Sequence, residues 1–172
     1  MGTGQTILAL GALALLSTSM LSLNRGYTSS SQSITQSKLG ITAVSLATSI
    51  IEEASGKAFD QKTDTTTVTA TSSLTAVSKL GRETGEFWPD SMTDFDDYNN
   101  LDTSKSFGDT VFARPYGGGT FRIKASVVYV DPSTPTVTAS SPTWCKKLTV
   151  TISSPQMVDT IKMQYLFTYW YY

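Results

Sequence analysis

The stretch from Met1 to Asn24 carries no charged side chain, and this feature restricts the fold more than any other. The first charge is Arg25, although the whole protein has 13 Lys and Arg residues and 14 Asp and Glu residues. The run from Thr6 to Leu23 is rich in Leu and Ala, which are strong helix formers. About 18 helical residues at about 1.5 Å each cover roughly 27 Å, the hydrocarbon thickness of a bilayer. The sequence therefore predicts an apolar helix that is long enough to span a membrane.

Three interpretations of this apolar segment compete. A cleavable signal peptide requires a basic region ahead of the apolar run, and no Lys or Arg precedes Thr6. A single-pass membrane anchor fits the length. A helix that is stored in the membrane and later buried in the core of a polymer also fits, and small residues such as Gly11 and Ser17 would let such helices approach closely. An apolar N-terminal segment with no Lys or Arg ahead of it is what remains after a short basic leader has been removed. We therefore expect Met1 to be the first residue of a processed protein.

A second, amphipathic helical pattern follows Arg25 and ends near Ala54. Its face residues recur at three-, four- and seven-residue steps, which is typical of a helix with one buried face. They are Ile34, Ile41, Val44, Thr48 and Ile51, and Leu39, Leu46 and Ile50 lie alongside them. Gly56 is expected to end the helix as its C-terminal cap, and Gly11, Gly26 and Gly40 are candidate bends or unwound points. The sequence thus predicts a helical stem over residues 1–56.

The remaining residues, 57–172, are predicted to form a globular head built on an antiparallel β-sheet. Apolar and polar residues alternate over Phe121–Tyr129, Leu148–Ile152 and Ile161–Tyr171, which is typical of half-buried strands. Thr65–Ala76 and Thr136–Ala139 are weaker candidates for strands. We expect one sheet face to pack on the amphipathic half of the helix, which gives an α+β fold.

Composition argues against enzymatic and nucleic-acid functions. The chain has no histidine, which removes the commonest general base and zinc ligand, and its net charge is −1. The pair Lys146-Lys147 is interpreted as solvated surface, and the single Cys145 as a small apolar filler. Gly117–Gly119 lacks the Lys-Ser/Thr of a phosphate loop and is expected to be a turn. We therefore predict no catalytic residue, no cofactor and no nucleic-acid partner.

An acidic segment between Asp90 and Asp102 is the one candidate for a metal site. Its carboxylates are the hard oxygen ligands that Ca²⁺ prefers, and the weak candidate ligands are Asp94, Asp96, Asp97 and Asp102. The spacing does not match an EF-hand loop, and Asp and Asn clusters also form turns. The adjacent Glu52 and Glu53 are interpreted as surface charges or partners of Lys57 rather than as an acid/base pair.

Two further segments complete a family pattern together with the uncharged helix. Residues 47–60 read ATSIIEEASGKAFD, and residues 95–100 read FDDYNN. With these segments the chain resembles the type IV pilin and pseudopilin superfamily. The resemblance implies a structural subunit that is held in the inner membrane, is polymerised by a pilus assembly machinery and ends in an extracellular filament of identical copies. It also implies a processed, methylated N-terminal residue, for which Met1 is suitable.

The same resemblance implies which residues touch neighbouring subunits. The expected contacts are Met1, Gln5, Ile7, Leu8, Leu10, Leu13, Leu16, Met20 and Leu23. The superfamily usually has a glutamate where this chain has Gln5, and that carboxylate is thought to neutralise the N-terminal amine of a neighbour. Gln5 can offer only a neutral hydrogen bond, which is weaker. Two alternatives remain open, namely a pseudopilin of a secretion system and a monomeric membrane-anchored binding domain.

Overall fold

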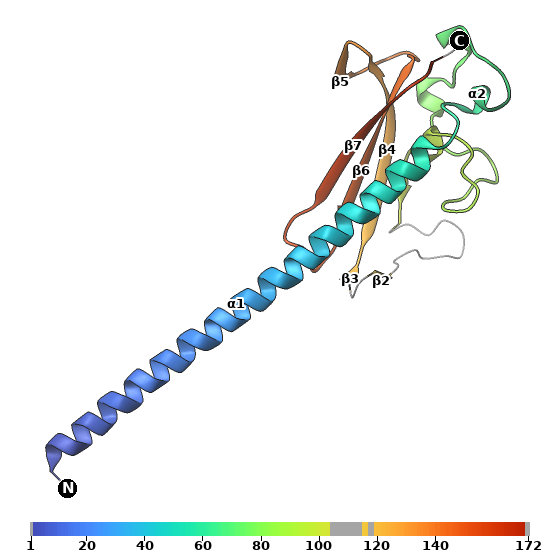
Figure 1. Ribbon diagram of the computed structural model, residues 1–172. Coiled ribbons are helices and arrows are strands. Elements are labelled where there is room, and N and C mark those ends of the chain that lie inside the picture. Colours follow the sequence, from blue (N-terminus) through green and yellow to red (C-terminus); the bar gives the residue numbers. More distant parts are fainter. Residues whose placement is uncertain (1, 104–114, 117–118, 171–172) are drawn as a thin grey trace. The chain divides into compact units, whose positions relative to one another are not determined.

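A computed structural model of the protein describes residues 2–103, 115–116 and 119–170 (Figure 1). The chain forms two compact units, residues 1–38 and residues 39–172, here called the N-terminal and C-terminal units. Helix α1 (Thr3–Ser55) supplies all regular structure of the first unit and the first element of the second. It runs without interruption through Gly11, Gly26 and Gly40, so the unwound points expected there do not occur.

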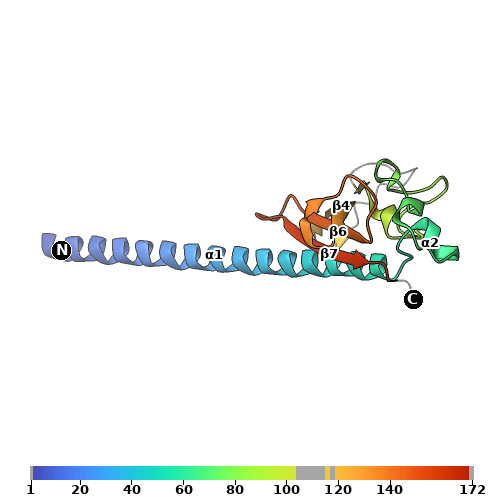
Figure 2. The same cartoon turned by 90° about the horizontal axis from the view of Figure 1, so that it is seen from above.

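The C-terminal unit is an α+β structure, as predicted. Residues 39–55 of α1 pack against the sheet through a face with three- and four-residue spacing (Figure 2). The buried side chains of this face are Leu39, Ala43, Ala47, Ile50 and Ala54. Two residues of the predicted face, Ile41 and Val44, are instead 72% and 43% exposed. The alanines explain the difference, because their small side chains allow the helix backbone to lie close to the strands.

The main sheet is antiparallel and has the order β1-β4-β6-β7, with β5 also paired to β4. Its strands are β1 (Leu101–Asp102), β4 (Arg122–Asp131), β5 (Thr134–Thr138), β6 (Cys145–Ser153) and β7 (Ile161–Thr168). A separate pair joins β2 (Pro115–Tyr116) to β3 (Gly119–Thr120). The predicted strands in β4, β5, β6 and β7 are confirmed. The end predicted for the last strand, at residue 171, lies outside the described residues.

The register of the sheet aligns the apolar sides of its central strands. Ala125 of β4 pairs with Val150 of β6, and Val150 pairs with Met163 of β7. Every second residue of β4 from Phe121 to Tyr129 is buried, so the alternation in the sequence does mark the core face.

The segment between helix and sheet contains short helices rather than the predicted strand at 65–76. It consists of α2 (Gln61–Thr65) and the 3₁₀ helices η1 (Thr71–Ser73), η2 (Val77–Lys79) and η3 (Asp96–Tyr98). Asp60 starts α2 by a capping box with Thr63, and its carboxylate also accepts hydrogen bonds from both the N–H and the hydroxyl of Thr75. The strand prediction is wrong because side chains of this polar segment hydrogen-bond to nearby groups instead of leaving the backbone to pair.

Candidate functional site

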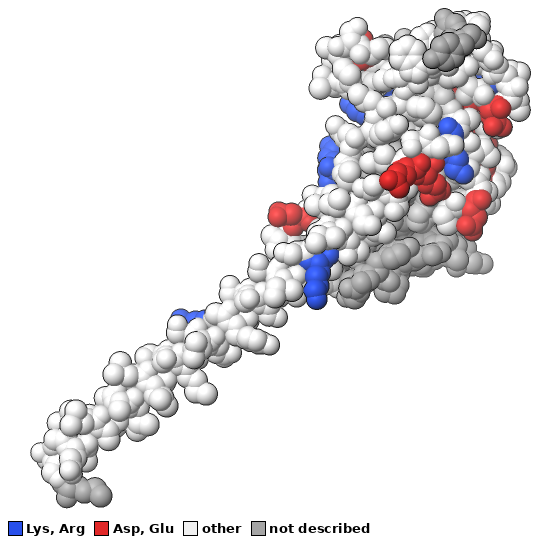
Figure 3. Space-filling model, in the orientation of Figure 1, with Lys and Arg blue, Asp and Glu red and all other residues white. Residues whose placement is uncertain are grey.

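Taken by itself, the N-terminal unit presents an apolar helical surface over its described residues. None of the residues 2–38 is buried, and the part of α1 before Arg25 carries neither positive nor negative charge (Figure 3). The large apolar side chains are 54–76% exposed, and they are Ile7, Leu8, Leu10, Leu13, Leu15, Leu16, Met20, Leu21 and Leu23. At about 100° per residue, these positions point to every side of the helix. A helix that is apolar all round is normally buried in protein or lipid.

Two hydroxyl groups in this surface form hydrogen bonds within the helix. The Ser17 hydroxyl donates to the carbonyl of Leu13 at 2.8 Å, and the Thr18 hydroxyl donates to the carbonyl of Leu15 at 3.0 Å. These bonds satisfy the hydroxyl protons within the helix, so that burial would not leave them unpaired. Helix Thr3–Ser55 is the one helix in the described residues that is long and apolar enough to cross a membrane.

The structure places most predicted contact residues on this surface, but it does not bring them together in a pocket of one chain. Gln5 is exposed, and its backbone N–H donates to the Gly2 carbonyl at 2.9 Å. Met1 lies outside the described residues. Leu15 and Leu21 were not among the predicted contacts, yet they are as exposed as the others, which shows that the apolar surface has no polar side.

A buried ion-pair network connects the sheet of the C-terminal unit to the segment before it. Lys146 on β6 is 0% exposed, and its Nζ donates to Asp96 Oδ1 at 2.5 Å, to the Phe59 carbonyl at 2.7 Å and to Asp60 Oδ2 at 3.0 Å. The ammonium also lies 4.6 Å from the Phe59 ring centroid and 5.2 Å from that of Tyr129. The prediction that Lys146 is solvated surface is therefore wrong.

The two carboxylates bound to Lys146 have different surroundings. Asp60 also receives hydrogen bonds from Lys62, Thr75 and Tyr129. Burial acts to raise the pKa of Asp60, but the attraction of Lys146 and these donors lower it below its ordinary value. Burial raises the pKa of Asp96 in spite of Lys146, and its Oδ2 is buried without a hydrogen-bond partner.

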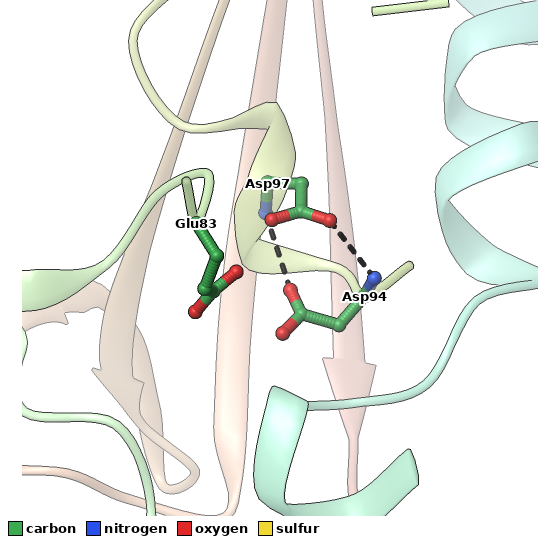
Figure 4. A group of neighbouring side chains, drawn as sticks. All are labelled: Glu83, Asp94 and Asp97. Atoms are coloured by element: carbon green, nitrogen blue, oxygen red, sulfur yellow. Dashed lines mark hydrogen bonds between the residues drawn. The ribbon is translucent and has the colours of Figure 1, made fainter. Parts of the chain in front are cut away.

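A second group of carboxylates lies beside this network and is called the acidic centre. It consists of Glu83, Asp94 and Asp97, each of which offers one oxygen within 4.8 Å of the others (Figure 4). Asp94 Oδ1 accepts from the Asp96 and Asp97 N–H groups, and Asp97 Oδ2 accepts from the Thr93 and Asp94 N–H groups. These bonds hold both aspartates in fixed orientations at the start of η3.

The remaining oxygens of the acidic centre are not satisfied. Asp94 Oδ2, Asp97 Oδ1 and Glu83 Oε2 are buried and receive no hydrogen bond in the described part of the chain. Burial and the charges of Asp96 and Asp97 raise the pKa of Asp94 to about 9. Burial, with a side-chain hydrogen bond to Glu86 and repulsion from it, raises the pKa of Glu83 to about 7 and that of Asp97 to about 6. The arrangement therefore favours binding of positive charge, either protons or a cation.

The structure separates the four predicted metal ligands. Asp94 and Asp97 meet in the acidic centre, whereas Asp96 points to Lys146. Asp102 accepts two hydrogen bonds from Arg122, at 2.9 and 3.1 Å, and lies 3.6 Å from Lys124 Nζ. Asp96 and Asp102 are thus engaged in ion pairs and are not part of one site with the other two.

Three functional residues were missed by reasoning from the sequence. Lys146 precedes Leu148, Val150 and Ile152 at two-residue intervals along β6. The alternation of buried and exposed residues in this strand therefore places Lys146 on the buried face. That signal was present. Asp60 is far along the chain from the Asp-rich segment, and Glu83 lies just before that segment, but no recognised ligand spacing connects either residue with it.

Other predicted features have mixed outcomes. Cys145 is buried, which agrees with its interpretation as a core residue. Glu53 accepts a 2.7 Å hydrogen bond from the buried Tyr98 hydroxyl, so it helps to connect α1 to η3 rather than acting only as a surface charge. In the Gly117–Gly119 turn, residues 117 and 118 lie outside the described residues.

Comparisons with family models, with curated proteins and with solved structures each found no match to this chain. The architecture itself is pilin-like, because a long helix with an apolar N-terminal part continues into a segment that packs on an antiparallel sheet.

Proposed function

We propose that this protein is a structural, non-enzymatic subunit of a filament, in which residues 3–23 of α1 are buried among the same helices of other copies. The observation that carries the proposal is the charge-free helical surface of the N-terminal unit, which has apolar side chains on every side. Burying such side chains contributes roughly 25 cal/mol per Å² of apolar area removed from water. A single chain in water would leave these side chains exposed and would not gain this stabilisation.

The proposed assembly of the subunit has two stages. The monomer is held in the inner membrane by the apolar helix, which has the length and hydropathy for this. An assembly machinery then transfers it into an extracellular filament, where contacts between unlike faces of identical copies let the polymer grow without closing. Gln5 would offer a neighbouring N-terminus a hydrogen bond in place of an ion pair.

Small residues in the helix favour packing between copies over simple anchoring. A Cβ atom added at Gly11 meets no atom within 4 Å in the single chain, so nothing inside one copy requires glycine there. Glycine in a helix costs about 1 kcal/mol relative to alanine, and small residues allow close helix–helix approach. A short secretion-system filament built from a pseudopilin is the second candidate, because it uses the same packing.

The test replaces Gly11 by Leu, which keeps the segment apolar and adds bulk only at the proposed contact. We expect Gly11→Leu to remain at wild-type levels in the membrane but to form few filaments in electron micrographs of sheared surface material. Leu10→Ile is the matched control and should form normal filaments. A monomeric anchor predicts that Gly11→Leu behaves like the control, and that result would reject the proposal.

A second variant tests the need for an apolar core. Leu13→Lys places a charge in the centre of the segment, which costs about 2.5–3.5 kcal/mol in a membrane helix. We expect it to abolish filaments while the C-terminal unit stays folded, as judged by tryptophan fluorescence. Leu13→Met should assemble normally. Normal filaments from Leu13→Lys would show that this face is not buried in the assembly.

A further inference from the structure

We propose that Glu83, Asp94 and Asp97 form a calcium site that fastens the loop before Glu86 to the start of η3. The inference is independent of filament formation, since all three residues belong to the C-terminal unit. Two separate observations support it. One oxygen from each carboxylate lies within 4.8 Å of the other two, and each residue also has a buried oxygen without a hydrogen-bond donor.

The orphaned oxygens point to a ligand because the rest of each aspartate is well satisfied. Asp94 and Asp97 are both 0% exposed, and each uses one oxygen to accept two backbone N–H groups. Their second oxygens are turned toward Glu83, as Figure 4 shows. The first oxygens alone would complete a purely structural capping role, and leaving a buried acceptor without a partner destabilises the fold.

The balance of charge also favours a divalent cation. The carboxylates that interact here are Asp60, Glu83, Glu86, Asp94, Asp96 and Asp97. The positive groups that act on them are Lys146, which is already bound to Asp60 and Asp96, and Arg82, which is attracted to Asp97. These two protein cations do not balance the six carboxylates, and protons held by the acidic centre make up part of the difference. A divalent cation would take the place of those protons.

The geometry suits calcium. Oxygen ligands lie 2.3–2.6 Å from Ca²⁺, so two ligands of one ion are at most about 4.6–5.2 Å apart. One oxygen from each residue of the acidic centre lies within 4.8 Å of the other two, which is a separation that one calcium ion can span. Calcium also accepts irregular coordination with mixed carboxylate and other oxygens, while Mg²⁺ retains its waters and requires a near-octahedral arrangement.

Binding would add a link between two segments that hydrogen bonds already connect, from Thr93 to Glu86 and from Asn99 to the Leu80 carbonyl. Glu83 belongs to a turn between Gly81 and Gly85, both of which have positive φ, and its N–H donates to Glu86 Oε2 at 2.8 Å. Asp94 and Asp97 flank Asp96, the partner of Lys146. A cation shared by the three carboxylates would thus hold the turn against the segment that carries the buried ion pair.

The test uses the full-length protein in a non-ionic detergent, stripped with EDTA and exchanged into chelator-free buffer. Isothermal titration with CaCl₂ should show one ion per chain with a dissociation constant between about 10⁻⁶ and 10⁻³ M, and MgCl₂ should bind at least about tenfold more weakly. Calcium at about 100 times its dissociation constant should raise the melting temperature of the C-terminal unit by about 5–10 °C, followed by tryptophan fluorescence.

Asparagine variants separate a metal ligand from a structural residue. Asp94→Asn and Asp97→Asn can still accept the backbone N–H groups, and their amides can donate to the neighbouring carboxylate. We therefore expect an unchanged or raised melting temperature in EDTA but at least a tenfold loss of calcium affinity. Asp90→Asn, an exposed acid of the same segment, is the control and should bind like the wild type.

Three results would overturn the site. The first is that the wild type shows neither heat nor a melting shift with millimolar calcium. The second is that magnesium binds as tightly as calcium. The third is that Asp97→Asn keeps the wild-type affinity for calcium. A variant that melts lower in EDTA and still responds fully to calcium would assign Asp97 a structural role only. None of these results depends on whether the protein forms filaments.

Discussion

Replacing Lys146 by Met would remove the one cation that is fully enclosed in the C-terminal unit's ion-pair network. Methionine fills nearly the same volume, so the packing around Phe59 and Tyr129 is largely kept. The substitution deletes the donors to Asp96 Oδ1, Asp60 Oδ2 and the Phe59 carbonyl. Asp96 would lose its ion pair with Lys146, and its Oδ2 is already buried without a hydrogen-bond partner in the described residues.

The expected loss of stability follows from the fate of these two carboxylates. Asp60 keeps the hydrogen bonds from Lys62, Thr75 and Tyr129, so it tolerates the change better. Asp96 must stay charged without a partner or take up a proton. Protonating a carboxyl with an ordinary pKa near 3.9 costs about 4 kcal/mol at pH 7. Breaking a buried pair typically costs 3–5 kcal/mol, and we expect Lys146→Met to lose that amount.

The assay is denaturant unfolding of the full-length protein in detergent at pH 7, followed by tryptophan fluorescence. Lys147→Met is the matched control, since the half-buried Lys147 donates to the Pro135 carbonyl and should lose no more than about 1 kcal/mol. Adding Asp96→Asn to Lys146→Met should recover part of the loss, because it removes the uncompensated charge. A loss below 1 kcal/mol for Lys146→Met would refute the reasoning that water is excluded from the network and that its carboxylates need Lys146 to remain buried and charged.

Two further predictions concern the same unit. In EDTA its stability should fall as the pH rises from about 4 to 9, because Glu83, Asp97 and Asp94, with pKa values raised to about 7, 6 and 9, keep protons that the unfolded chain releases near pH 4. Saturating calcium should flatten this dependence, and stability that instead rises between pH 5 and 8 in EDTA would contradict it. Tyr98→Phe removes the 2.7 Å bond to Glu53 and should cost about 1–2 kcal/mol in denaturant unfolding. An unchanged midpoint would show that this bond does not stabilise the junction of α1 and η3.

The fold class was predictable because each half of the chain has one dominant periodicity. The strands β4, β6 and β7 alternate in polarity with a period of two, and the charge-free segment has the composition of an apolar helix. The buried face of α1 was harder to predict. Hydrophobicity correctly selected Leu39 and Ile50, but it missed Ala43 and Ala47 and included the exposed Ile41.

The acidic centre was only half predictable, for a physical reason. Asp94 and Asp97 are three residues apart at a 3₁₀ turn, where they face the same side, while Asp96 between them faces Lys146. Closeness in sequence therefore grouped residues that the turn separates. Glu83 joins the centre through a turn that requires positive φ at Gly81 and Gly85, and composition gives no sign of where such a turn directs its side chains.

The central claim is that residues 3–23 are covered by other copies of the same helix. Cryo-electron microscopy of the full-length protein recovered from its native cell surface tests it most directly. We predict fibres in which these helices pack side by side along the axis, with the β-sheet units outside. Isolated molecules, each with this helix surrounded only by lipid, would contradict the claim.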